Sequence, residues 1–235
     1  MAKVVIFSGA GISAPSGIST FRDTGGLWEK YEIEDICSAG CLETNRDETI
    51  DFYDKRREDI KDKTPNSAHK MLAAIAEKYP KEIKIITQNV DDMFEKAGCK
   101  DVLHLHGFLK EICCEYCSYK QNIGYEAQKN SYKICPKCSH YLRPNIVFFG
   151  EPAPRYADLY HNMQNCEMLV VIGTSGNVIN TDIFLNNKIK KSILNNLEPS
   201  SAIDDSLYSK VLYKSVTQAI DEIIFDIEDF LSNAN

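Results

Sequence analysis

A short apolar run at residues 4–7 passes directly into Ser-Gly-Ala-Gly at residues 8–11. This pattern predicts a buried strand that ends in a tight turn. Gly9 and Gly11 can adopt positive φ and carry no Cβ, so a diphosphate can approach the backbone closely. A helix that opens at Ile12 would direct its unpaired N–H groups and positive dipole end at that anion. We therefore expect a nucleotide-binding chain.

Apolar runs typical of central strands recur along the chain, and helical patterns separate several of them. We expect strands at residues 4–7, 83–87, 102–105, 168–172, 192–194 and 211–213, and helices at residues 67–79, 93–97 and 215–231. Such alternation favours an α/β fold with a parallel sheet covered on both faces. Two stretches break the alternation: residues 24–65 are charged and helical, and residues 108–143 hold cysteine pairs. We expect them to form a smaller lobe, with ligands bound between the lobes.

The composition is that of a globular chain. Its 235 residues are 43% hydrophobic, enough for one substantial domain with a small appendage. The net charge is −7, and basic residues are mixed with acidic ones, so nucleic acid is not expected as a direct partner. No apolar run approaches the roughly 18 residues of a membrane span. We expect a soluble, cytoplasmic protein that does not bind membranes.

Four of the nine cysteines form two C-x-x-C pairs, Cys114 with Cys117 and Cys135 with Cys138. Their spacing is typical of a zinc site, and without a signal peptide it favours metal over disulfides. Four thiolates complete a tetrahedral shell and leave no open position, so the zinc is expected to be structural. A redox role is the weaker alternative, because a thioredoxin-type motif needs only one pair. Cys113 adjoins the first pair, and the turn geometry favours Cys114 as the ligand.

Polar residues follow two of the expected strands. Thr-Gln-Asn-Val-Asp at residues 87–91 lies at a strand's carboxyl end, where α/β sheets bind ligands. Asn89 and Asp91 suit a carboxamide such as that of nicotinamide, although a capped turn explains the pentapeptide equally well. His106, at the end of the next strand, can act as a general base near neutral pH. For His104, a structural role is the simpler interpretation.

The glycine turn also matches G-x-G-x-x-A, the dinucleotide fingerprint of dehydrogenases, at residues 9–14. That fingerprint requires an uninterrupted helix, whereas Pro15, Ser16 and Gly17 interrupt any helix after one turn. The run instead resembles the signature of the sirtuins, the NAD-dependent protein lysine deacylases, which reads Gly-Ala-Gly-Ile-Ser followed by Gly-Ile-x-Thr-Phe-Arg. The resemblance implies a Rossmann-like NAD-binding domain with a small domain inserted. The NAD-binding domain would comprise residues 1–23, 66–107 and 144–235. The small domain would comprise the helical insertion 24–65 and the zinc-ribbon insertion 108–143.

The resemblance also implies which residues bind NAD and the acylated lysine of a protein substrate. Those expected at NAD are Gly9, Ala10, Gly11, Ile12, Ser13, Phe21, Arg22, Asp23, Trp28, Gln88, Asn89, Val90, Asp91, Gly173, Thr174, Ser175, Asn196, Leu197, Glu198 and Val216. The extended segment at residues 145–149 is expected to bind acyl-lysine as an added strand, through Val147, Phe148 and Gly150. The chain departs from the family pattern at Phe94, at residues 179–181 and beyond residue 199, where the adenine contact is weakly marked.

The mechanism implied by the resemblance begins when the acyl oxygen attacks C1′ of the nicotinamide ribose and nicotinamide leaves. His106 then accepts a proton from the ribose hydroxyls, so that the 2′ oxygen can attack the alkylamidate carbon. Lysine and O-acyl-ADP-ribose are released. Asn89 and Asp91 would orient the ribose and the carboxamide, and Phe21 and Arg22 would shield the reacting centre.

Tyr53 and Arg56 stand at i and i+3 in the charged insertion and point the same way on a helix. A phenol and a guanidinium can together hold a carboxylate, although a solvated charged face is the simpler interpretation of these residues alone. Sirtuins that act on succinyl- and malonyl-lysine carry Tyr-x-x-Arg at this place and share Gly25-Gly26 followed by Trp28. The resemblance therefore implies a preference for dicarboxylic acyl groups, with acetyl-lysine accepted less readily.

Four alternatives remain open on the sequence alone. The chain could be mainly a deacetylase, or a protein ADP-ribosyltransferase. A nicotinamide oxidoreductase would reduce NAD and regenerate it without releasing nicotinamide. A zinc-ribbon adaptor would bind partners without any catalysis.

Overall fold

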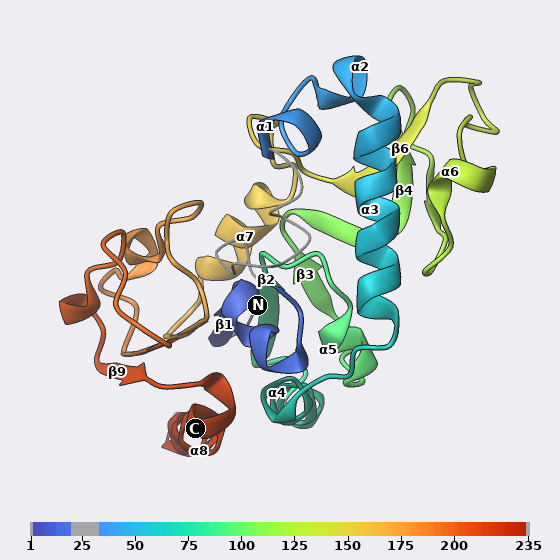
Figure 1. Ribbon diagram of the computed structural model, residues 1–235. Helices are drawn as coiled ribbons and strands as arrows, with labels where there is room; N and C mark the ends of the chain where they lie inside the picture. Colours follow the sequence, from blue (N-terminus) through green and yellow to red (C-terminus); the bar gives the residue numbers. More distant parts are fainter. Residues whose placement is uncertain (1, 20–32, 234–235) are drawn as a thin grey trace.

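The computed structural model describes residues 2–19 and 33–233. Figure 1 shows a large sheet with a small one beside it, and the six strands of the large sheet run in the order β3-β2-β1-β7-β8-β9. These strands are β1 (Val4–Ser8), β2 (Ile83–Thr87), β3 (Val102–His104), β7 (Met168–Ile172), β8 (Lys191–Asn196) and β9 (Lys210–Tyr213). All neighbouring pairs are parallel. This is the doubly wound order, in which ligands bind where the order reverses, here between β1 and β7.

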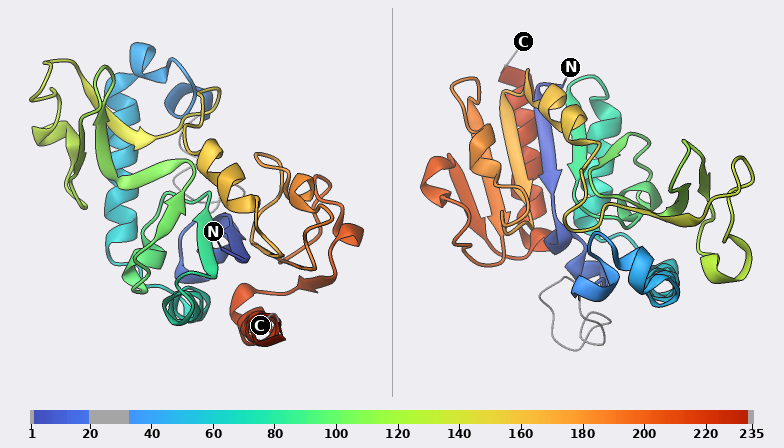
Figure 2. Two further views of the ribbon diagram at one scale, coloured as in Figure 1. Left: turned by 180° about the vertical axis from the view of Figure 1, so that it is seen from behind. Right: turned by 90° about the horizontal axis from the view of Figure 1, so that it is seen from above.

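Helices cover both faces of this sheet, as predicted, which explains why its central strands are apolar throughout. One face packs against α4 (Ser67–Lys78) and α8 (Val216–Asn233), and the opposite face packs against α7 (Tyr156–Met163). Figure 2 shows these layers from behind and from above. Shorter helical segments in this part of the chain are α5 (Met93–Lys96) and the 3-10 helices Ala10–Ile12, Ala14–Ser16, Thr181–Phe184 and Asp205–Leu207.

The three strands of the small sheet are antiparallel and run in the order β5-β4-β6. They are β4 (Gly107–Cys114), β5 (Lys120–Asn122) and β6 (Leu142–Ile146). The helices beside them are α1 (Ile33–Ile36), α2 (Cys41–Thr44), α3 (Arg46–Lys61) and α6 (Gln128–Ser131). In Figure 1, α3 stands beside β4 and β6, and α1 and α2 lie near its N-terminal end. The two stretches that interrupt the expected alternation therefore lie together.

A buried ion pair ties α3 to the small sheet. Arg57 is fully buried, and its guanidinium donates to Asp54 Oδ1 at 2.7 Å and to the carbonyl of Leu109 in β4 at 3.1 Å. Asp54 in turn accepts the backbone N–H of Gln128, the first residue of α6, at 2.7 Å. Buried charges are tolerated only when they are paired and hydrogen-bonded, so this network depends on each of its members.

Replacing Arg57 with methionine is expected to destabilise the protein by about 3 kcal/mol, because it leaves the buried Asp54 carboxylate without its cation. Chemical denaturation of the two proteins measures this difference. The control is Lys55→Met on the same helix, since Lys55 pairs with Asp51 at 2.6 Å in an exposed position. That change is expected to cost less than about 1 kcal/mol. Equal losses in the two variants would contradict a special role for the buried pair.

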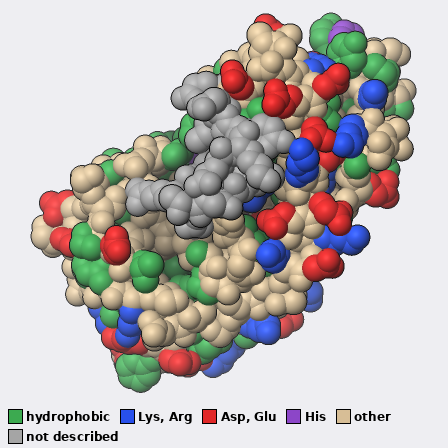
Figure 3. Space-filling model, viewed as in Figure 1, with side chains coloured by type: hydrophobic (Ala, Val, Ile, Leu, Met, Phe, Trp, Pro, Cys, Tyr) green, Lys and Arg blue, Asp and Glu red, His purple; other side chains and the backbone are tan. Residues whose placement is uncertain are grey.

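Among the described residues, no helix is both long enough and apolar enough to cross a bilayer. On the face drawn in Figure 3, positive and negative side chains of the described residues are interspersed, and neither sign forms a continuous stripe. This distribution agrees with the mixed charge pattern of the sequence.

Candidate active site

The loops that follow β1 and β7 touch where the strand order reverses. The N–H of Gly9 donates to the carbonyl of Ile172, and the N–H of Gly11 donates to the carbonyl of Gly173, both at 2.9 Å. A Cβ added to Gly9 would lie 2.7 Å from the carbonyl oxygen of Gly173. A Cβ added to Gly11 would lie 2.7 Å from the Cα of Gly173. No side chain fits at either position, so glycine here permits the approach of one loop to the other.

The expectation of positive φ at Gly9 and Gly11 is wrong. The φ of Gly9 is −122°, and Gly11 is absent from the described glycines with positive φ. The expected helix from Ile12 is also wrong, because two short 3-10 helices replace it and Gly17 ends the second with a φ of 76°. Close contact with Gly173, not a left-handed turn, requires glycine at these positions.

Hydrogen bonds join side chains from several strand-end loops. Asn89 Nδ2 donates to Ser13 Oγ at 3.1 Å, which links the loop after β2 to the segment after β1. Gln88 Nε2 donates to Thr174 Oγ1 at 2.9 Å, which links the loop after β2 to the loop after β7. At the end of β8, Asn196 donates to the carbonyl of Thr174, also at 2.9 Å. The structure thus brings five predicted site residues together at the carboxyl edge of the sheet.

The other residues expected at NAD are less closely connected. The carbonyl of Ser175 accepts the hydroxyl of Ser200 at 2.6 Å, which links the loop after β7 to the segment after β8. Ala10 and Val90 are half-buried, whereas Leu197 and Glu198 are exposed after β8. Val216 begins α8, and its side chain packs into the core. Four of the predicted residues lie outside the described part of the chain, namely Phe21, Arg22, Asp23 and Trp28.

Asp91 places a buried carboxylate beside this cluster. Burial raises the pKa of its carboxyl group, and hydrogen bonds from the Met93 N–H and the Ser13 hydroxyl oppose that rise. The Met93 N–H lies 3.1 Å from Asp91 Oδ1. The capped turn that the sequence also allowed is therefore present, and it leaves Asn89 and Asp91 beside Ser13.

His106 follows β3, and both nitrogens of its ring have partners. Nδ1 lies 3.1 Å from the carbonyl of Gln88, and because a carbonyl can only accept, Nδ1 carries a proton. Nε2 lies 3.2 Å from the hydroxyl of Tyr156, at the start of α7. Burial lowers the pKa of His106, and the Gln88 carbonyl only partly opposes this. The ring is therefore neutral at pH 7, with a lone pair on Nε2 that can accept a proton.

His104 has the structural role that its sequence position suggested. Its Nδ1 lies 2.8 Å from the carbonyl of Asn89, and its Nε2 lies 2.9 Å from Glu95 Oε1. Burial acts to lower the pKa of His104, but the Glu95 carboxylate and the Asn89 carbonyl outweigh it, so the net pKa is raised. His104 thereby holds the backbone of Asn89 in place.

Tyr53 is buried on α3, where its ring stacks on that of Phe148 with the centroids 5.7 Å apart. Its hydroxyl lies 3.0 Å from the Sγ of Cys37. The phenol therefore lies against the segment that we expect to bind acyl-lysine. The solvated charged face that the sequence alone favoured is wrong for this residue.

Arg56, one turn further along α3, is also buried, with only 7% of its surface exposed. Its Nη1 lies 3.8 Å from Asp59 Oδ2, and the carboxylates of Asp59 and Asp91 favour the charged form of its guanidinium. Burial outweighs these attractions and lowers the pKa of Arg56. The cation thus lies near the carboxylates of Asp59 and Asp91, one helical turn from Tyr53.

The segment at residues 145–149 is less open than a bare strand edge. Val147 donates its N–H to the carbonyl of His106 at 2.9 Å. Phe149 donates to the carbonyl of Cys37 and accepts the N–H of Ala39, both at 2.8 Å. These backbone groups of Val147 and Phe149 are therefore already paired, and binding of a peptide along the rest of the run stays a prediction. The carbonyl of Val147 accepts no hydrogen bond from the described residues, so it is a free backbone acceptor within this run.

The four cysteines of the C-x-x-C pairs converge, as predicted. Their Sγ atoms all lie within 4.8 Å of one another. Sulfurs placed about 2.3 Å from a tetrahedral zinc stand about 3.8 Å apart, so this group fits zinc. Cys113 lies outside it, with its Sγ 4.0 Å from the carbonyl of Pro144. Four thiolates close the shell, and a zinc ion here would support the fold without contacting substrate.

Sequence reasoning missed three residues around these sites, which are Tyr156, Arg143 and Glu151. Tyr156 has no local signal, because its contact to His106 joins distant parts of the chain. Arg143 and Glu151 bracket an apolar run with opposite charges, and that pattern could have indicated their pairing.

Known proteins share this architecture. The model of the Sir2 family matches residues 9–180. An NAD-dependent protein deacylase of Campylobacter jejuni is 46% identical over 236 residues, covering 100% of both chains. A protein of the same name from Helicobacter hepaticus is 40% identical over 254 residues, covering 98% of this chain and 99% of its own.

Solved structures agree with these relatives. A mutant Sir2 homologue in complex with ADP-ribose superimposes with a TM-score of 0.86 at 28% identity, covering 97% of this chain and 93% of that one. A Sir2 homologue in complex with NAD superimposes with a TM-score of 0.85 at 29% identity, covering 97% of this chain and 90% of that one.

Proposed function

This chain belongs to the Sir2 family and is an NAD-dependent protein-lysine deacylase, and from that premise we propose that it removes succinyl and malonyl groups more readily than acetyl groups. The observation that carries this proposal is the burial of a phenol and a guanidinium, Tyr53 and Arg56, one turn apart on α3, with the phenol stacked on Phe148. A buried cation interacts strongly with an anionic ligand, because little water screens the attraction. The carboxylate of a succinyl or malonyl tail supplies such an anion, and an acetyl group does not.

The substrates are proposed to meet at the carboxyl edge of the parallel sheet. NAD would lie across the contact between the loops after β1 and β7, near Ser13, Asn89 and Thr174. The acyl-lysine would enter beside Val147, whose carbonyl would accept the N–H of the side-chain amide. Its acyl tail would then run along Phe148 towards Tyr53.

His106 is proposed as the general base. Its Nδ1 proton is held by the Gln88 carbonyl, so Nε2 is the atom that would take a proton from the ribose of NAD. Asn89 and Asp91 would orient the ribose and the nicotinamide carboxamide. We also propose that the domain division follows the two sheets, with residues 24–65 and 108–143 forming the small domain and Cys114, Cys117, Cys135 and Cys138 holding its zinc.

Removal of the phenol hydroxyl and the guanidinium together is expected to abolish the acyl preference. In Tyr53→Phe with Arg56→Met, kcat/KM for a succinyl-lysine peptide should fall at least about tenfold, since each hydrogen bond to a charged group contributes roughly 1.5–3 kcal/mol. For the acetyl-lysine form of the same peptide it should change less than about threefold. Nicotinamide release from NAD with succinyl-, malonyl- and acetyl-lysine peptides measures all three rates.

Lys55→Met provides the control for this assay, because Lys55 lies on the exposed face of the same helix. It should retain the acyl preference of the wild type. A wild type that prefers acetyl-lysine, or a double variant that still prefers succinyl-lysine, would contradict the proposed carboxylate site.

A further inference from the structure

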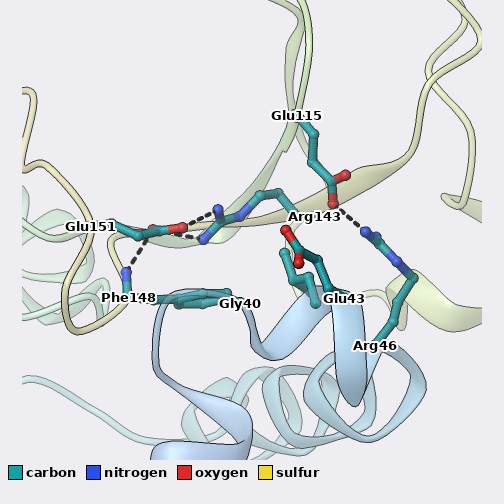
Figure 4. A pocket seen from close by; sticks show the side chains of 8 residues that line it. Gly40, Glu43, Arg46, Glu115, Arg143, Phe148 and Glu151 are labelled. Carbon is teal, nitrogen blue, oxygen red and sulfur yellow. Dashed lines mark hydrogen bonds and ion pairs between the residues drawn. The ribbon is translucent and has the colours of Figure 1, made fainter.

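A charged cavity of about 200 Å³ lies beside the segment that carries Val147, and two arginine–glutamate pairs line it (Figure 4). In the first pair, the guanidinium of Arg143 donates to both carboxylate oxygens of Glu151, at 2.5 and 3.0 Å. In the second, Arg46 Nη2 donates to Glu115 Oε1 at 2.6 Å. The cavity therefore contains two similar ion pairs that can be compared directly.

Only the first pair contacts the backbone near Val147. Arg143 Nη2 also donates to the carbonyl of Ile146 at 3.0 Å, and Glu151 Oε2 accepts the backbone N–H of Phe148 at 2.9 Å. The Cζ of Arg143 lies 4.0 Å from the centre of the Phe148 ring. The pair thus holds the backbone on both sides of Val147, as Figure 4 shows for Phe148.

The Phe148 N–H and the Val147 carbonyl belong to one peptide group. A trans peptide is planar, so its N–H and C=O point in opposite directions, and the described residues contain no cis peptide. When Glu151 fixes the N–H, it also fixes the direction of the carbonyl, which points away from Glu151. The charge of the carboxylate polarises the peptide group as well, which makes the carbonyl a stronger acceptor.

We propose that Glu151, held by Arg143, is a positioning residue that directs the Val147 carbonyl at the amide N–H of the acylated lysine. This inference rests on the proposed placement of acyl-lysine at Val147, and it is independent of the acyl preference. Arg143 contributes by fixing both carboxylate oxygens, a bidentate geometry that lysine cannot reproduce.

The test is a cycle of two changes, one in the enzyme and one in the ligand. A labelled acetyl-lysine peptide is compared with its ester analogue, in which oxygen replaces the N–H of the side-chain amide. Equilibrium binding to the full chain, without NAD, should be about three- to tenfold tighter for the amide in the wild type. In Glu151→Ala the amide should lose this advantage, with less than a twofold difference remaining, because the carbonyl is no longer directed at the N–H.

Two further variants separate positioning from folding. Arg143→Lys should reduce the advantage of the amide as Glu151→Ala does, and it keeps the positive charge in the cavity. Glu151→Gln retains an acceptor for the Phe148 N–H. Its affinity advantage for the amide peptide should therefore be closer to that of the wild type than the advantage in Glu151→Ala. Arg46→Lys is the matched control from the second ion pair and should bind both peptides as the wild type does.

The possible outcomes distinguish this inference from the placement on which it rests. If the wild type binds amide and ester equally, acyl-lysine does not bond to the Val147 carbonyl, and both ideas fail. If the wild type prefers the amide but Glu151→Ala and Arg143→Lys keep that preference in full, only the positioning role of the ion pair is overturned. If these variants lose the same factor of affinity for the amide and for the ester peptide, the positioning role of the ion pair is overturned as well.

Discussion

Replacing His106 with asparagine is expected to lower kcat by about 10²- to 10⁴-fold, the usual contribution of a positioned general base. Asparagine can still donate to the Gln88 carbonyl, but it has no nitrogen lone pair to accept the ribose proton. His106 is only half-buried, so melting temperature and zinc content should stay close to those of the wild type. Nicotinamide release with an acetyl-lysine peptide at saturating NAD measures kcat for both proteins.

The pH dependence of the wild type checks the same assignment. Burial lowers the pKa of His106 below its ordinary value of 6.5, so the neutral base form persists to more acidic pH. The acidic limb of kcat/KM is therefore expected to have its midpoint below pH 6.5, with activity rising to a plateau as pH increases above that midpoint. A His106→Asn enzyme that keeps more than a tenth of the wild-type kcat would show that another group accepts the proton.

Removing one thiolate from the cysteine cluster is expected to have the largest effect on stability. Structural zinc contributes an apparent free energy of about 10–16 kcal/mol at pH 7 in small zinc domains, and Cys135→Ser removes one of four ligands. The zinc content should fall well below one ion per chain, and β4, β5 and β6 should become sensitive to protease. Turnover should fall too, because Arg57 and Asp54 tie α3 to β4 and α6.

Cys113→Ser is the control for the zinc prediction, because Cys113 adjoins Cys114 in sequence but lies outside the cluster. It should keep one zinc per chain and the protease resistance of the wild type. Metal analysis by mass spectrometry and limited proteolysis compare the two variants. Loss of zinc from Cys113→Ser alone would contradict the ligand set.

The parallel sheet was predictable because each of its strands is a short apolar run bounded by turn signals. All six strands and the three expected helices lie within two residues of their predicted bounds at each end. The zinc ligands were predictable for a similar reason, since the spacing of C-x-x-C turns is itself a local signal. In both cases the information lies within a few neighbouring residues.

Contacts between distant parts of the chain were not predictable in this way. The contact that requires glycine at positions 9 and 11 was not predictable, because it is made with Gly173 and not within the local turn. Nothing near Tyr156 in the sequence indicates that its hydroxyl meets His106. Likewise, the burial of Arg57 on a charged helix becomes visible only once the small sheet packs against α3.

The interlock of Gly9, Gly11 and Gly173 limits how this crevice can change. Neither loop has space for even one methyl group unless the other withdraws, although they belong to opposite halves of the sheet. A first loop transplanted from a different protein would therefore need its counterpart after β7 to be transplanted with it. The loops after β1 and β7 can therefore be exchanged only as a pair, whether by evolution or by protein engineering.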